Sequence, residues 1–234
     1  MLKEFVEKIV SLKENKIYTV GSDTYSDNPL VRIEKHVDRP NVLSLSSLES
    51  VVKFIKKEQP IIKRRVFVHV YDYDNVRVFT TYDDVFGRDN IYNVVSDVQN
   101  NVTGWKDYEN AIISLKSQFV QNEGTEYMLN ILSRITDENS VSSEDNGITQ
   151  TVEARKGISL SGKETIKSRV ALMPYRTFLE VEQPKSEFIV RLREGGQIGL
   201  FEADGGMWKL EAKKNIKEFL EKELVHETAV VVTA

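Results

Sequence analysis

Residues 65–82 carry the clearest structural pattern in the chain: Arg-Val-Phe-Val-His-Val-Tyr-Asp-Tyr-Asp-Asn-Val-Arg-Val-Phe-Thr-Thr-Tyr. Valine recurs at every second position from 66 to 70, and aromatic or histidine side chains lie between the valines. Alternating β-branched and aromatic residues are typical of a strand. Residues 72–75 have the composition of a turn, and residues 76–82 are strand-like again, so the stretch predicts an antiparallel hairpin.

The hairpin is flanked by a predicted helix and a predicted third strand. The strand is expected over residues 90–98. The helix is expected to begin at Ser46, because residues 46–49, Ser-Ser-Leu-Glu, match a capping box. Pro60 is expected to end this helix, since proline supplies no backbone N–H.

A second helical region follows the predicted sheet. Apolar residues spaced by three and four predict a helix over 105–121; they are Trp105, Tyr108, Ile112, Leu115 and Phe119. Gly124 comes next, and residues 127–135 have a further apolar stripe at helical spacing. Either a helical hairpin or one long helix bent at Gly124 is therefore expected.

The second half of the chain is rich in strand patterns. Strands are expected at 148–154, 166–173, 177–182, 187–192 and 197–202. A helix is expected over 209–223, with a final strand over 225–233 that includes the apolar run 229–232. The residues expected to be buried on this helix are Leu210, Ile216, Phe219 and Leu220.

The start of the chain predicts an amphipathic helix over 2–14, a short strand over 16–20 and a polar loop over 21–29. Residues 137–147 have almost nothing to bury and predict a linker. The expected organisation is an N-terminal helix and arm (1–40), an α+β half (41–136), the linker (137–147) and a β-rich half (148–234). The expected fold class is α+β: antiparallel β-meanders packed with amphipathic helices, with a C-terminal helix and strand.

Composition excludes several kinds of site. The 234 residues include no cysteine, which excludes disulfides, zinc–thiolate sites and thiol nucleophiles. The formal net charge is −4, whereas proteins that hold duplex DNA usually carry a basic balance or a basic face. No signal peptide and no membrane-spanning run is expected, because charged residues interrupt every apolar stretch.

Catalytic motifs are weak throughout. The three histidines lie far apart, and neither a nucleophile elbow nor a phosphate-binding glycine loop occurs. One pattern resembles a metal-dependent nuclease: Asp204 followed by Glu211 and Lys213. Glu211 and Lys213 fall in the predicted helix, however, where residues two apart point in different directions. We therefore expect no enzyme, metal or cofactor, with a nuclease as a minor alternative.

One basic run could contact nucleic acid. Its members are Lys56, Lys57, Lys63, Arg64 and Arg65. Such a run can neutralise phosphates, but it is also what a solvated helix end followed by a strand looks like. Nucleic-acid binding through these residues stays an alternative hypothesis.

Three motifs resemble a known family. Residues 174–184 are Pro-Tyr-Arg-Thr-Phe-Leu-Glu-Val-Glu-Gln-Pro, residues 200–208 are Leu-Phe-Glu-Ala-Asp-Gly-Gly-Met-Trp, and residues 145–150 are Asp-Asn-Gly-Ile-Thr-Gln. Together they look like the YfdQ-like family of phage and prophage proteins, a domain of unknown function. The resemblance extends from 43–55 to about residue 224. It implies a phage or prophage origin, the cytoplasm of the bacterial host, and gene neighbours in recombination and replication.

The motif residues themselves are interpreted as structural or interfacial. Prolines at both ends of 174–184 predict a strand between them. Even spacing would place Arg176, Glu180 and Glu182 on one strand face, as a buried ion network or a subunit contact. Trp208 is expected to pack the following helix onto the sheet. The full set of candidate interface residues is Tyr175, Arg176, Glu180, Glu182, Asp204, Gly205, Gly206 and Trp208.

These observations favour a non-enzymatic phage protein that acts by homo-oligomeric assembly or by binding a macromolecule. The apolar run 229–232 supports this hypothesis, because such a strand must be covered within the chain or by another subunit. One alternative is an accessory factor in phage DNA recombination or replication that binds nucleic acid. Another is a capsid-like shell protein with an N-terminal arm, a β-hairpin and a long helix.

Overall fold

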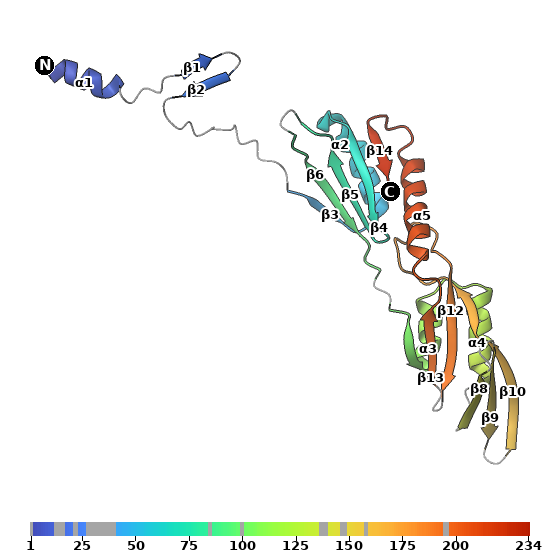
Figure 1. Ribbon diagram of the computed structural model, residues 1–234. Coiled ribbons are helices and arrows are strands. Elements are labelled where there is room, and N and C mark those ends of the chain that lie inside the picture. The colour runs from blue at the N-terminus through green and yellow to red at the C-terminus, as the bar shows by residue number, and fades with distance from the viewer. Residues whose placement is uncertain are drawn as a thin grey trace. The chain divides into compact units, whose positions relative to one another are not determined.

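The structure is a computed structural model that describes residues 2–11, 17–20, 23–26, 41–83, 86–98, 101–135, 140–145, 149–156, 159–193 and 197–234. The chain divides into two compact units, Met1–Arg39 and Pro40–Ala234 (Figure 1). The first unit contains helix α1 (Leu2–Ser11) and an antiparallel pair of strands, β1 (Ile17–Val20) and β2 (Asp23–Ser26). Strand β2 lies where the sequence predicts a polar loop, since its residues have no apolar alternation.

A five-stranded sheet forms the first half of the second unit. Its order is β14-β4-β5-β6-β3. The strands are β3 (Leu43–Leu45), β4 (Val66–Asp72), β5 (Asn75–Thr80), β6 (Asn90–Val95) and β14 (Val230–Thr233). Strands β4, β5 and β6 are antiparallel, which confirms the predicted hairpin and third strand, while β14 and β3 join the two edges in parallel.

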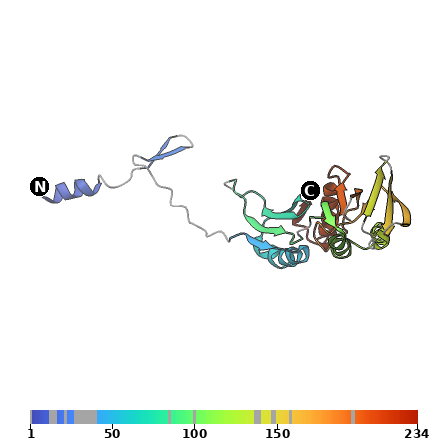
Figure 2. The same ribbon diagram turned by 90° about the horizontal axis from the view of Figure 1, so that it is seen from below.

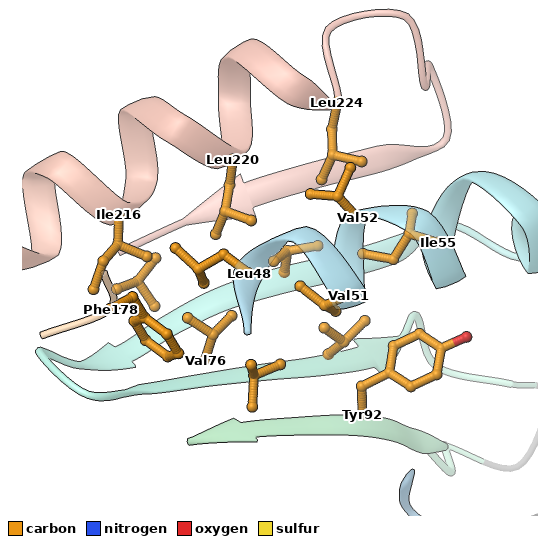
Figure 3. Close-up of a cluster of buried hydrophobic side chains, with 14 of the residues drawn as sticks. Leu48, Val51, Val52, Ile55, Val76, Tyr92, Phe178, Ile216, Leu220 and Leu224 are labelled. Carbon is orange, nitrogen blue, oxygen red and sulfur yellow. The ribbon is translucent and has the colours of Figure 1, made fainter. Parts of the chain in front are cut away.

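Two helices cover one face of this sheet: α2 (Leu48–Ile62), seen along one side of the strands in Figure 2, and α5 (Trp208–Glu223). Figure 3 shows their apolar side chains pointing toward those of the sheet. The buried sheet residues are Val66, Val68, Val70, Val76, Val78, Tyr92 and Val94, and the helices contribute Leu48, Val51, Val52, Ile55, Ile216 and Leu220. Each fully buried aliphatic side chain contributes about 2 kcal/mol, so this cluster fixes the register of the sheet.

A four-stranded antiparallel sheet forms the second half of this unit and has its own core. Its order is β11-β12-β13-β7. The strands are β7 (Gly104–Asp107), β11 (Arg169–Leu172), β12 (Ser186–Arg193) and β13 (Gln197–Glu202). Helices α3 (Tyr108–Ser117) and α4 (Glu123–Ile135) pack against it through a second cluster that includes Leu115, Phe119, Met128, Leu132, Phe188 and Val190.

A three-stranded antiparallel meander lies between α4 and β11 in chain order. It consists of β8 (Ser140–Asp145), β9 (Thr149–Lys156) and β10 (Ser159–Lys167). Strand β8 therefore lies inside the segment 137–147 that the sequence predicts as a linker. Ser, Glu and Asp can form a strand here because β9 supplies all of the backbone partners of β8.

Each of the two sheets contains strands from both predicted halves, 41–136 and 148–234. Strand β7 precedes the linker segment but pairs with β13, and β14 follows it but pairs with β4. The α+β class with antiparallel meanders, an N-terminal helix and a C-terminal helix and strand is confirmed. The two predicted halves, however, do not correspond to the two sheets.

Several predicted helix boundaries differ from the structure, among them the end of the helix predicted over 105–121, which lies at Ser117. The N-cap of α2 is Ser47 rather than Ser46, and its hydroxyl accepts from the Ser50 N–H at 3.2 Å. Helix α2 continues through Pro60 to Ile62 and ends at Lys63 in the left-handed conformation. Only one backbone hydrogen bond is lost at a proline, and packing of α2 on the sheet outweighs that loss.

Helix α3 begins at Tyr108 instead of 105, because Asp107 caps it by accepting from the Asn110 N–H at 2.9 Å. Trp105 belongs to β7, where its ring lies 5.6 Å from that of Phe201 in an edge contact. Its spacing to Tyr108 matches a helix only by coincidence. The helical hairpin alternative is confirmed, since α3 and α4 are separate helices in contact with each other.

Gly124 lies in the first turn of α4, against the backbone of β11. A Cβ atom at this position would overlap the carbonyl oxygen of Ala171. We expect Gly124→Ala to lower the free energy of unfolding by about 2 kcal/mol, although alanine is the better helix former. Urea unfolding at one protein concentration measures the change. Glu126→Ala, at an exposed position two residues later, is the control and is expected to change stability by less than about 0.5 kcal/mol.

Candidate functional site

The motif loop, residues 174–184, is irregular and is organised by one buried amide. The Gln183 side-chain oxygen accepts from the backbone N–H groups of Arg176 and Thr177, at 3.0 and 3.3 Å. Its side-chain nitrogen donates to the carbonyl oxygens of Phe178 and Val181, at 2.9 and 3.2 Å. The strand predicted over 177–182 is therefore absent, because Gln183 supplies the hydrogen bonds that a neighbouring strand would give.

The motif loop joins the first sheet and its helices. Phe178 and Val181 are buried in the core beneath α2 and α5. Glu180 accepts from the Leu48 N–H at 2.7 Å and from the Glu49 N–H at 3.4 Å. A carboxylate at this position satisfies free N–H groups at the start of α2 and complements the helix dipole.

Arg176 does not contact Glu180 or Glu182, contrary to the predicted network. With Ser186, Glu202, Asp204 and Trp208 it forms what we call the Arg176 cluster. Arg176 donates to Glu202 Oε1 at 2.7 Å and to the Ser186 hydroxyl, and its guanidinium carbon lies 3.8 Å from the centre of the Trp208 ring. The side chain is only 6% exposed.

Two further hydrogen bonds connect the members of the Arg176 cluster. The Ser186 hydroxyl donates to Asp204 Oδ2 at 2.6 Å, and the Trp208 indole N–H donates to Glu202 Oε2 at 3.3 Å. Burial lowers the pKa of Arg176 to about 10 against the opposing effect of the Glu202 and Asp204 carboxylates, so Arg176 stays cationic at neutral pH. Burial alone would raise the pKa of Asp204, but the hydrogen bonds from Ser186 and the Gly206 N–H, with the Arg176 charge, hold it below its usual value.

Residues 203–207 make the turn into α5. Gly205 and Gly206 adopt φ values of 64° and 85°, a region that favours glycine. The turn places Trp208 against Arg176 and against the ring of Tyr73, 4.8 Å away. The cluster thereby links β12, β13, the motif loop and the start of α5, and Trp208 packs this helix as expected.

The arrangement around Asp204 does not match the nuclease pattern. Its two oxygens accept from Ser186 and from the Gly206 N–H, and Glu211 and Lys213 lie within α5. In the described part of the chain, no group of three or more histidines and carboxylates could hold a metal ion.

The basic run does not form one patch. Lys56 lies on α2 and pairs with Glu223 at 3.6 Å, and Arg64 pairs with Asp89. Lys57 is exposed on α2, and Lys63 ends that helix. Arg65 is exposed and directly precedes β4, so strand alternation directs it to the sheet face opposite the buried Val66.

That opposite face, which we call the outer face, carries rings and guanidinium groups. Phe67 on β4 and Phe79 on β5 stack with their ring centres 5.7 Å apart. Arg77 lies 3.7 Å from the centre of the Tyr71 ring, and Arg88 lies 4.0 Å from that of Tyr82. Alternation in residues 65–82 predicts the shared face of Phe67, His69 and Tyr71, but not the arginines that cover it.

Helix α1 has an exposed apolar surface, which we call the arm stripe. It consists of Leu2 (81% exposed), Phe5 (63%), Val6 (51%) and Ile9 (48%). The flanking side chains, Lys3, Glu4, Glu7 and Lys8, are exposed and balance in charge. The helix predicted for 2–14 is thus present over Leu2–Ser11, with its apolar side open.

Comparisons with family models, with curated proteins and with solved structures found no match to this chain. No helix in the described residues has both the length and the apolar character needed to cross a bilayer.

Proposed function

We propose that the protein acts without catalysis, by assembling with further copies of itself through α1. The observation that carries the proposal is the arm stripe, four apolar side chains on one side of a helix that are each about half or more exposed. A helix of 10 residues is marginal alone in water, and most helices gain their stability by packing an apolar face. A covering surface on another molecule supplies that packing.

The charges beside the arm stripe favour a second copy as the partner. Lys3 and Lys8 balance Glu4 and Glu7, so two like surfaces do not repel each other. Because these charges cancel, α1 has no net charge that would attract a strongly acidic or strongly basic partner. Other large apolar side chains are exposed on the second unit, at Leu179, Met207 and Leu210, and offer a neighbour's arm a contact area.

A phage or prophage origin and residence in the bacterial cytoplasm belong to the same proposal. The support is the resemblance of residues 174–184 and 200–208 to YfdQ-like proteins. A capsid-like shell is a narrower form of the assembly, supported by an N-terminal arm, a β-meander (β8–β10) and open sheets. Negative-stain images of closed particles of uniform size would support the shell, whereas small rings or dimers would leave only the general assembly.

Light scattering on the purified full chain tests the assembly. The expected mass is a multiple of 26.8 kDa. Phe5→Ala with Ile9→Ala removes two side chains per arm that assembly would bury, about 3 kcal/mol, and is expected to weaken association by about a hundredfold or more. The mass measured at low concentration should fall toward that of one chain.

The matched control is Lys3→Ala with Glu7→Ala, which makes two alanine substitutions on the polar side of α1 and leaves net charge unchanged. We expect this variant to keep the mass of the unaltered protein. A single-chain mass for the unaltered protein at all concentrations would refute assembly, and equal loss in both variants would refute the role of the arm stripe.

A further inference from the structure

The outer face of the five-stranded sheet has the composition of a surface for an anionic, aromatic ligand. Helices α2 and α5 both contribute to the core on the opposite face. Within the five strands Asp72 is the one acidic residue and Arg77 the one arginine, and the Asp72 carboxylate accepts from the Tyr73 N–H at 2.8 Å in the hairpin turn. The segments beside these strands carry Asp74, Asp83 and Asp89 as well as Arg65 and Arg88. Arginines lie on or beside the same face at 65, 77 and 88.

Rings and guanidinium groups already lie together on this face. Arg88 lies 5.1 Å from the centre of the Phe79 ring and 5.8 Å from that of Phe67, above the stacked phenylalanine pair. Arg77 covers Tyr71, which is 51% exposed. Arg77 makes no ion pair with any described residue, so its charge is available to a ligand.

The side chains on this face fit a nucleic acid better than they fit a protein partner. A protein partner that buried this face would have to cover arginine side chains packed on rings, with few aliphatic side chains between them. Nucleobases stack on phenylalanine, tyrosine and the planes of arginine, and phosphates pair with arginine. Positions 67 and 71 are about 13 Å apart along β4, and open sheet faces of this kind stack two or three bases.

We propose that the outer face binds single-stranded nucleic acid. Phe67, Phe79 and Tyr71 stack the bases, and Arg65 and Arg77 hold the phosphates. The site is independent of the arm stripe and gives the accessory role in recombination or replication a physical location. It includes only Arg65 of the basic run, because the other four members lie on α2 or beside it, with Lys56 and Arg64 in ion pairs.

Binding is expected to be weak and sensitive to salt, because the net charge of −4 opposes it and two arginines supply the attraction. For two phosphate contacts on a single strand, the logarithm of the association constant falls with log salt at a slope of about −1.4. Duplexes are expected to bind more weakly, since their bases are already stacked on each other.

Fluorescence anisotropy with labelled oligo-dT and oligo-rU of about 15 nucleotides measures this binding within known site sizes. Tyr71→Ala is expected to weaken binding about tenfold through loss of one stacked base. Arg77→Ala should also weaken binding and make the salt slope shallower by about 0.7. Arg77→Lys is expected to restore the slope but not the full affinity, because lysine has no flat surface for stacking.

Arg193→Ala is the matched control. Arg193 lies 3.6 Å from the centre of the Trp105 ring, a contact of the same kind on the four-stranded sheet. This variant loses one charge and one arginine–ring contact away from the outer face. We expect its affinity and salt slope to equal those of the unaltered protein.

Several results would overturn the proposal. They are no binding of either oligonucleotide at low salt, unchanged binding in Tyr71→Ala and Arg77→Ala, or equal weakening by Arg193→Ala. A smaller mass by light scattering for Tyr71→Ala, without oligonucleotide binding by the unaltered protein, would assign the face to a contact between copies. Tighter binding of oligo-rU than oligo-dT, or the reverse, would support the proposal and identify the natural strand.

Discussion

Replacing Phe178 with alanine is expected to lower the free energy of unfolding by about 4 kcal/mol. Phe178 is 1% exposed and lies among Leu48, Val76 and Ile216 in the core of the five-stranded sheet (Figure 3). The motif loop that carries it is held by Gln183 and by the contact of Glu180 with α2. Because those contacts limit movement of the loop, the surrounding side chains cannot collapse fully into the space that the ring leaves.

The neighbouring residue supplies the control for this prediction. Leu179 is 67% exposed, so Leu179→Ala should change stability by less than about 0.5 kcal/mol. Chemical unfolding of both variants at one fixed protein concentration gives the comparison, since association would otherwise alter the apparent stability. Similar losses in the two variants would show that Phe178 does not anchor the loop in the core.

Arg176→Met is expected to cost about 3 kcal/mol of stability. Methionine fills much of the volume but leaves Glu202 without its cation and removes the planar group that covers Trp208. Burying a carboxylate without its partner is costly, although the Glu202 side chain is 30% exposed and can partly rehydrate. Arg176→Lys should recover only part of the loss, because lysine cannot contact Glu202, Ser186 and the ring together.

A double-mutant cycle isolates the pair energy. Arg176→Met combined with Glu202→Gln should be more stable than the sum of the two single losses predicts, because no charge is then left alone. Additive losses would contradict an energetic link between the two side chains. Arg193→Met, at the exposed contact with Trp105, should cost less than about 1 kcal/mol.

Local patterns predicted most strands and helices because one face of each element is covered. Alternation in residues 65–82 arises from a sheet with helices on one side, and β4 and β5 follow it. Strand β13 was predicted with both ends correct, since glycines precede and follow it. The buried stripe of α5 was only partly predicted: Leu210 is 70% exposed, while Trp208 and the small Ala212 are buried.

The motif loop shows why one class of element was missed. Thr177, Leu179 and Val181 alternate as in a strand, yet Thr177, Phe178 and Val181 are the buried ones. The side chain of Gln183, six residues after Thr177, accepts a hydrogen bond from the Thr177 backbone N–H. No local sequence pattern predicts such a contact. Arg176, Asp204 and Trp208 were singled out by their motifs, but their partners Ser186 and Glu202 were not. Ser186 lies on β12 outside both motifs, and Glu202 lies inside the second motif, where nothing in the sequence indicates its contact with Arg176.

The sequence also offered no prediction that β7 would pair with β13 or that β14 would pair with β4. The partners of β7 and β14 are far away in sequence, and period and composition carry no information about which strands pair. Part of the outer face could be predicted, because alternation along β4 places Phe67, His69 and Tyr71 on one side of that strand. Arg65 directly precedes β4, but Arg77 comes from β5 and Arg88 from the segment before β6, so the complete surface exists only after pairing.

The pairing of β14 with β4 has a consequence for biosynthesis. His69 and Thr233, joined by a hydrogen bond of 3.0 Å, are 164 positions apart. During translation β4, β5 and β6 leave the ribosome early, but the edge of β4 has no partner until β14 has been synthesised. An apolar edge that stays unpaired for that time can pair with another nascent chain. Because this pairing joins distant parts of the chain, we expect slow folding that benefits from chaperones.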